Sequence, residues 1–126
     1  MVIIAKNDFY TLETDIIKNR VFLTINGFWK KDNIPHYLED WDKALKQVEK
    51  GFTLLTDARK MAIHPSEVRS IHLEAQKKII NAGVKKVAEL QEQKVAEMQL
   101  NGVSTESALP KKNFTEKEKA ISWLDE

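Results

Sequence analysis

Gly51-Phe52-Thr53-Leu54-Leu55-Thr56-Asp57 is the stretch on which the predicted fold rests. Its five middle residues are apolar or β-branched throughout, which is typical of a strand that is covered on both faces of a sheet. We therefore predict a buried central strand at 52–56, with helices on both faces and a loop that begins at Asp57. Because ligands and partners of such sheets approach where strands end and helices begin, we expect function between Asp57 and Val68.

Amphipathic patterns predict a helix on each side of this strand. The upstream helix is expected to start at Asp32 or Asn33 and to end at Gly51. The downstream helix is expected to have Pro65 as its first residue and to close at 81–83. The two buried stripes are Ile34, Leu38, Trp41, Leu45 and Val48 in the first helix, and Val68, Ile71, Ala75, Ile79 and Ala82 in the second.

The downstream helix carries a second, weaker apolar stripe that consists of Leu73 and Ile80. These two residues point away from the first stripe. Two interpretations remain open: the helix lies deeper in the fold than its neighbour, or it offers an apolar patch to a partner.

The remaining segments add elements at both ends of the chain. They are an antiparallel strand pair from Phe9 and at Val21–Ile25, a less fully covered strand at Val84–Leu90, a helix at about Gln91–Asn101, an extra turn or mobile loop at 103–107, an edge strand at Phe114, and a last helix from Glu116 with a capping box of Thr115 and Glu118. This order predicts one α/β domain over residues 1–126. Its sheet is mostly parallel, with four to five strands and an antiparallel edge at the N-terminus, and about four helices accompany it.

Composition narrows the possible functions. The 126 residues suffice for one core, and a net charge of +1 gives no overall attraction to nucleic acid or to an anionic membrane. The chain has no cysteine, which excludes disulfides, thiolate zinc sites and a cysteine nucleophile. The apolar opening, residues 1–5, is too short for a signal peptide or a membrane span, so we expect a cytoplasmic protein.

The order of elements, together with particular residues, resembles the STAS family, named for sulfate transporters and anti-sigma-factor antagonists, and especially its small SpoIIAA-like bacterial members. The resemblance covers most of the chain. Its carriers are Ile25-Asn26-Gly27, the stretch 52–57, the passage Ala82-Gly83-Val84-Lys85-Lys86-Val87-Ala88, and Phe114 with residues 118–124. It implies a regulatory module that binds another protein and is not an enzyme.

The resemblance also points to a phosphorylation switch at the start of the second helix. The family's antagonists carry a serine there within an Asp-Ser-Ser-Gly motif. The matching place reads His64-Pro65-Ser66-Glu67, so Ser66 is the candidate while the rest of the motif has no counterpart. A phosphate at a helix N-terminus is favoured by the free N–H groups, but Glu67 repels it, and a serine in a first turn is equally explained by its bonds to the backbone.

Other polar residues are weaker candidates. Asp57, Arg59 and His64 in one expected loop could form a small pocket for acid-base work or anion binding, although no nucleophile or metal partner accompanies them. His36 with Glu39 and Asp40 has the spacing of a weak metal site but is better explained as a solvated face, and His72 as a packing residue. The lysine pairs lack an aromatic ladder and no phosphate-binding glycine loop is present, so we predict no nucleic-acid partner and no cofactor.

Three functions therefore remain as hypotheses. The first is a regulatory domain that binds a protein partner through Asp57, Arg59, His64, Ser66 and Glu67, with the Leu73 and Ile80 stripe as a further contact. The second is a small-ligand or lipid-binding protein, or a cryptic enzyme, with a cavity near Asp57, Arg59 and His64. The third is a domain that associates with itself, for example as a homodimer.

Overall fold

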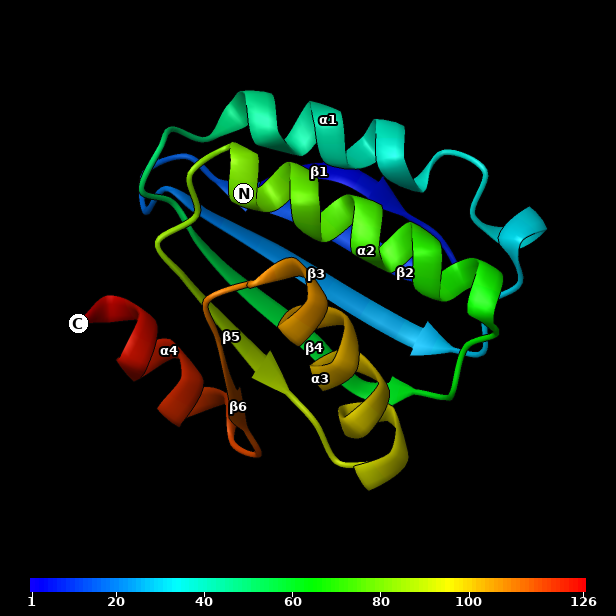
Figure 1. Cartoon of the computed structure of the whole chain (residues 1–126). Coiled ribbons are helices and arrows are strands. Elements are labelled where there is room, and N and C mark those ends of the chain that lie inside the picture. The colour runs from blue at the N-terminus through cyan, green and yellow to red at the C-terminus, as the bar shows by residue number, and fades with distance from the viewer.

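The computed structural model describes all 126 residues as a three-layer α/β structure (Figure 1). Its strands are β1 (Val2–Lys6), β2 (Tyr10–Asp15), β3 (Arg20–Gly27), β4 (Thr53–Met61), β5 (Lys86–Leu90) and β6 (Lys111–Phe114). Its helices are α1 (Tyr37–Gln47), α2 (Ser66–Asn81), α3 (Lys94–Ser107) and α4 (Lys117–Asp125), with a short 3₁₀ helix, η1, at Lys31–Asn33.

The six strands form one sheet in the order in which they occur in the sequence. β1, β2 and β3 pair antiparallel, whereas β3 to β6 pair parallel. The predicted α/β class with an antiparallel N-terminal edge is confirmed. The sheet has six strands rather than four to five, because the apolar run at the start of the chain pairs with β2 as an edge strand. From the sequence, we considered this run only as a signal peptide or a membrane span.

The predicted central strand is confirmed, and it is longer than expected. Leu54 and Leu55 are 2% and 3% exposed, and β4 lies between β3 and β5. The expected loop from Asp57 is wrong, because pairing with β3 continues through Asn26 opposite Lys60 as far as Met61. Five further residues, three of them charged, therefore belong to the strand.

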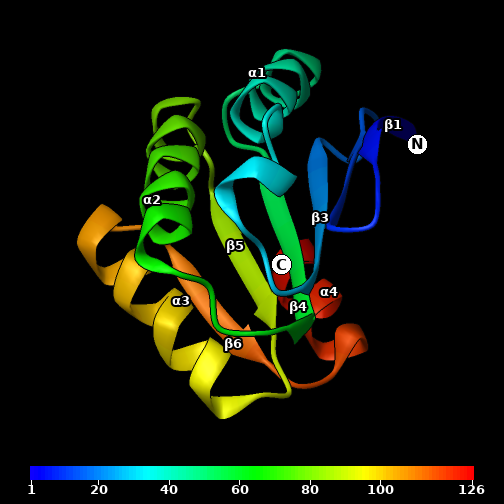
Figure 2. The same cartoon turned by 90° about the vertical axis from the view of Figure 1, so that its right-hand side faces the viewer.

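Helices cover the two faces unequally (Figure 2). α1, α2 and α3 cover one face and bury the main core, which includes Trp29, Trp41 and Leu54. α4 alone covers the other face, where it lies over β4 to β6 and closes a smaller core with Leu55 and Leu124.

The upstream helix begins later and ends earlier than predicted. Pro35 separates η1 from α1, and α1 ends at Gln47. Gly51 does adopt a left-handed φ of 91°, but in the connection to β4, where its N–H donates to the Gly83 carbonyl at 2.7 Å.

Three further expectations need correction. α3 runs through Gly102 to Ser107, because burial of Val103 offsets the cost of a helical glycine, which is about 1 kcal/mol relative to alanine. β5 is buried from Val87 to Leu90, more fully than its lysines suggested. The capping box is not formed, since Glu116 is the N-cap of α4 and has no side-chain hydrogen bond there. None of the helices has both the length and the apolarity required to cross a membrane.

Candidate functional site

The connection from β4 to α2, residues 62–65, is held by hydrogen bonds on both sides. The Ala62 N–H donates to the Gly27 carbonyl at 3.0 Å, which ties the connection to the end of β3. The Gln99 side chain of α3 accepts from the His64 N–H at 2.9 Å and donates to the His64 carbonyl at 2.6 Å. The connection is therefore a fixed segment at the end of the sheet where β3, β4 and β5 finish (Figure 2).

Beneath this connection, His64 and His72 form a hydrogen-bonded pair. Their side chains are 3% and 4% exposed, and Nδ1 of His64 lies 2.9 Å from Nε2 of His72. Nε2 of His64 lies 3.0 Å from the Gly27 carbonyl oxygen; because a carbonyl only accepts, this nitrogen carries the proton. In a neutral ring Nδ1 is then the acceptor, so His72 donates its Nε2–H to His64.

Burial keeps this histidine pair neutral. The pKa of His72 falls to about 3, first because of burial and second because His64 lies beside it. Burial also lowers the pKa of His64, against a smaller opposite effect of its hydrogen bond to Gly27. Trp29 stacks on both imidazoles, with ring centroids 4.9 and 5.2 Å away. His64 is thus part of the core and does not present its ring to a ligand or partner, and His72 packs in the core as expected.

Asp57 and Arg59 lie on the opposite face of the sheet from His64. Asp57 is two positions after Leu55, which belongs to the small core under α4, and alternate strand residues share a face. Arg59 donates to both Asp57 carboxylate oxygens, at 2.7 and 2.9 Å. Burial by itself raises the pKa of Asp57, but the hydrogen bonds from Arg59 outweigh it and hold that pKa below its usual value.

The three polar residues that were expected to converge are therefore separated by the sheet. Asp57 and Arg59 line a polar hollow of about 360 Å³ in which His64 takes no part, and its other lining residues are Thr24, Ile25, Asn26, Lys60 and Glu92.

Ser66 and Glu67 form the exposed first turn of α2. Ser66 is the first residue of the helix, one position later than the predicted start at Pro65, which is the N-cap. Both side chains are open to solvent at the same end of the sheet as the β4–α2 connection (Figure 2).

Leu73 and Ile80 are half-buried on the side of α2 that meets α3. Gln76, which lies between them along the helix, accepts a hydrogen bond of 2.6 Å from Ser107 of α3. One turn before Leu73, Arg69 forms an ion pair with Glu106 of α3, also across this junction. The stripe thus borders the junction of two helices, and neither residue is among the large exposed apolar side chains.

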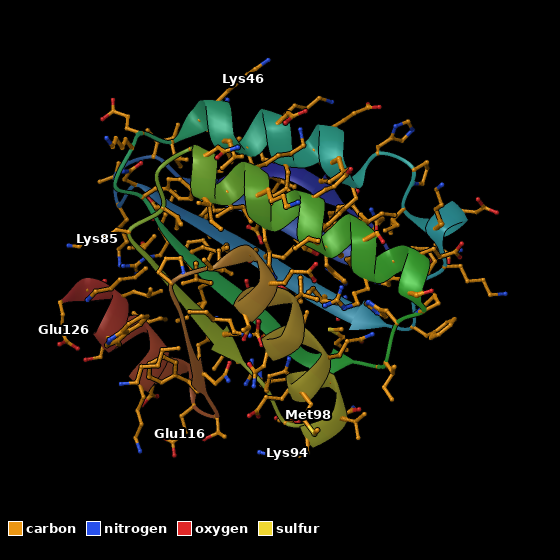
Figure 3. All side chains as sticks on the ribbon, viewed as in Figure 1. Lys46, Lys85, Lys94, Met98, Glu116 and Glu126 are labelled. Carbon is orange, nitrogen blue, oxygen red and sulfur yellow. The ribbon has the colours of Figure 1, made fainter.

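Four large apolar side chains are exposed at the carboxyl end of the parallel strands. Phe28 follows β3, Ile63 follows β4, and Val95 and Met98 lie at the start of α3; they are 51%, 51%, 55% and 63% exposed. Val95 and Met98 share a helix face with Gln99, whose side chain bonds to the backbone beside Ile63. Figure 3 shows Met98 on the outer side of α3. We call Phe28, Ile63, Val95 and Met98 the apolar end patch.

The sequence prediction did not identify this patch. Phe28 and Trp29 are adjacent large apolar residues that the sequence pattern does not distinguish, but only Trp29 is buried. Within the predicted helix at about 91–101, Val95 and Met98 form a thin apolar stripe of only two residues, three positions apart. The thin stripe was the available signal in the sequence. α3 buries Ala96, Leu100 and Val103 on its inner side and leaves Val95 and Met98 exposed.

The interior holds no room for a substrate-sized ligand. The enclosed hollow between the sheet, α2 and α3 measures about 30 Å³, enough for one or two waters, whereas ligand pockets measure roughly 300–1,000 Å³. Its polar wall includes Glu89, which pairs with Lys111 at 3.0 Å and whose pKa is raised by burial against the lowering effect of Lys111.

The spaced acidic and histidine residues do not gather into a metal site. His36 lies 3.4 Å from Glu39 on the surface, whereas Asp40 is buried and accepts the hydrogen bond of the Tyr10 hydroxyl. No group of three or more His, Asp or Glu side chains is placed to hold a metal ion.

No model of a known protein family matches the sequence, and no curated protein matches it. Solved structures do match. A DUF3478-family protein with a SpoIIAA-like fold from Shewanella loihica PV-4 is 14% identical, with a TM-score of 0.66 over 95% of this chain and 97% of that chain. An anti-sigma factor antagonist from Mycobacterium paratuberculosis is 12% identical, with a TM-score of 0.60 over 97% and 99%. SiaC of Pseudomonas aeruginosa is 10% identical, with a TM-score of 0.57 over 90% and 98%. At these identities the likeness establishes the fold: this chain has the SpoIIAA-like fold that its resemblance to the STAS family implied.

Proposed function

We propose that the chain is a non-enzymatic regulatory domain that binds a protein partner at the carboxyl end of β3, β4 and β5. The observation that carries this proposal is the apolar end patch. Scattered apolar residues are normal on a surface, but four large ones on neighbouring segments at one end of a sheet are typical of an interface. The exposed Ser66 and Glu67 of α2 lie beside the patch and supply a polar rim.

The fold and the shape of the molecule favour a protein over a small ligand. One structural neighbour is an anti-sigma factor antagonist, and such a protein acts on another protein. The rival hypothesis requires a deep apolar cavity with Asp57, Arg59 and His64 at its mouth. Instead, the sheet separates these residues and the enclosed hollow measures about 30 Å³. We propose the cytosol as the place of action.

The test compares two pairs of exposed, large apolar residues at different places on the molecule. The Phe28→Ser, Met98→Ser double variant removes half of the apolar end patch. The matched control, Ile3→Ser with Ile17→Ser, removes two residues that are 60% and 98% exposed on β1 and the β2–β3 turn. Quantitative affinity purification from the native cell should show partners that the patch variant loses by about tenfold or more, or 1.4 kcal/mol, and that the control retains. Equal retention by both variants contradicts the proposal.

Ser66 is the proposed site of regulation on this surface. A phosphate there adds about −1.5 to −2 charges beside the apolar end patch, and the exposed first turn leaves the hydroxyl accessible to a kinase. Intact-mass measurement of protein from its native cell tests this point. A species heavier by one phosphate that disappears in Ser66→Ala supports it, and an unmodified Ser66 under all growth conditions contradicts it.

A further inference from the structure

A groove runs between α1 and α2, next to the apolar end patch but distinct from it. Its volume is about 790 Å³, and it is open to solvent along the helices. The lining residues come from η1 and the segment that joins it to α1, from the start of α1 and from the first half of α2.

The floor of this groove is apolar. Leu38 and Ile71 pack against the main core and remain partly exposed in the groove, and Ile34 lies beneath them, 4% exposed. Pro35 extends the apolar surface toward η1. A half-covered apolar floor between two helices accommodates further apolar side chains from outside.

The rim of this groove is acidic. Asp32, Glu39, Glu67 and Glu74 border it, against one lysine, Lys31. Among the ion pairs of the chain, only Glu39 takes part, through His36 at 3.4 Å. Two cations of α2 are paired elsewhere, since Arg69 pairs with Glu106 and Lys78 pairs with Asp42.

Helix stability explains only part of this acidic rim. Glu39 and Glu67 occupy first turns, where a negative charge is favoured by the helix dipole. Glu74 lies in the middle of α2, where the dipole has no such effect, and Lys78, its natural partner four residues on, pairs with Asp42. Four carboxylates around one groove repel one another and concentrate negative potential above an apolar floor.

The secondary structure of the occupant follows from the walls of the groove. Both walls are helices, whose backbone groups are already paired, so the groove offers no strand edge to an incoming chain. A segment that enters it must satisfy its own backbone hydrogen bonds, which a helix does.

We propose that the α1–α2 groove binds a basic amphipathic helix of a partner protein. Its apolar residues pack on Leu38 and Ile71, and its lysines or arginines lie against Asp32, Glu39, Glu67 and Glu74. This proposal rests on the proposed function, because it too assumes that the partner is a protein. The α1–α2 groove and the apolar end patch are separate surfaces, and only Glu67 adjoins both.

The test uses a synthetic 16-residue peptide of leucine and lysine at helical spacing, labelled with a fluorophore, and the full chain. A scrambled peptide of the same composition controls for charge alone. Fluorescence anisotropy should show that Glu39→Lys with Glu74→Lys weakens binding by about tenfold or more, because two attractions become repulsions. The matched variant Glu49→Lys with Glu118→Lys changes two exposed carboxylates, one past the end of α1 and one on α4, neither of which lines the groove, and should bind as the wild type does.

Equal binding by the two double variants, or by the two peptides, overturns the proposal. Amide chemical-shift mapping gives an independent readout: shifts should centre on Leu38, Ile71 and Glu74. Shifts centred on Phe28 and Met98 overturn the groove assignment but leave the proposed function standing. Peptide binding in the groove, combined with unchanged partner capture by Phe28→Ser, Met98→Ser, supports the groove and contradicts the apolar end patch.

Discussion

Phe28 and Trp29 are adjacent in the sequence, as are Ile63 and His64, yet each pair is divided between surface and core. Trp29 and His64 stack on each other inside the molecule, with centroids 4.9 Å apart, whereas Phe28 and Ile63 are each 51% exposed. The inner members fix the two segments in place. The outer members contribute little burial, so their apolar character is unexplained by folding and fits a surface that another protein covers.

The largest expected effect is a difference in stability between a variant of Phe28 and a variant of its neighbour Trp29. Trp29→Ala should lower the free energy of unfolding by about 3–5 kcal/mol, because it leaves a cavity in the main core beside both histidines. Phe28→Ala should cost less than about 1 kcal/mol, because much of its ring is already in water. Urea denaturation of the two variants measures this difference. Similar losses for both would mean that Phe28 belongs to the core and that the comparison fails.

The second effect is a dependence of stability on pH that comes from the buried histidine pair, His64 and His72. Below pH 6.5 the unfolded chain protonates His72, whereas the folded chain does so only near its pKa of about 3. The contribution of neutral His72 to the free energy of unfolding is therefore fully present above pH 6.5. It is lost as the pH falls, by about 1.4 kcal/mol per pH unit, or about 2 kcal/mol at pH 5. His64 adds to the loss, since burial lowers its pKa too.

The His72→Gln variant isolates this effect, because glutamine keeps an N–H donor for His64 and does not titrate. Its free energy of unfolding, measured by urea denaturation between pH 7 and pH 5, should fall less steeply with falling pH than that of the wild type. The difference in slope should correspond to about one proton fewer taken up on unfolding. Phe28→Ala should keep the wild-type slope. An unchanged slope in His72→Gln contradicts the assignment of the buried neutral pair.

The sequence predicted those parts of the fold whose signals are local. Residues 52–56 form an uninterrupted apolar or β-branched run that is too short for a helix, which favours a buried strand. The end of β4 was missed because Asp57, Arg59 and Lys60 have the charges of a loop. Their place in the strand depends on pairing with β3, which is a tertiary contact without a local signal.

The candidate site was predicted only in part, for a similar reason. Proximity to the end of the central strand directed attention to Ser66 and Glu67, and both side chains are exposed there. Which of Phe28 and Trp29 is buried depends on how the chain leaves β3, and the pattern of apolar residues is the same in either case. The contact of α3 with the β4–α2 connection, through Gln99 and His64, joins residues 35 positions apart and has no local signal.

The most direct test of the central claim is photo-crosslinking in the native cell. A photoreactive phenylalanine analogue replaces Phe28 in one variant and Ile17, which is 98% exposed at the opposite end of β3, in another. Mass spectrometry then identifies what each position contacts. We expect a defined protein to be crosslinked from position 28 and none of that protein from position 17. No crosslink from position 28, or the same products from both positions, would contradict it.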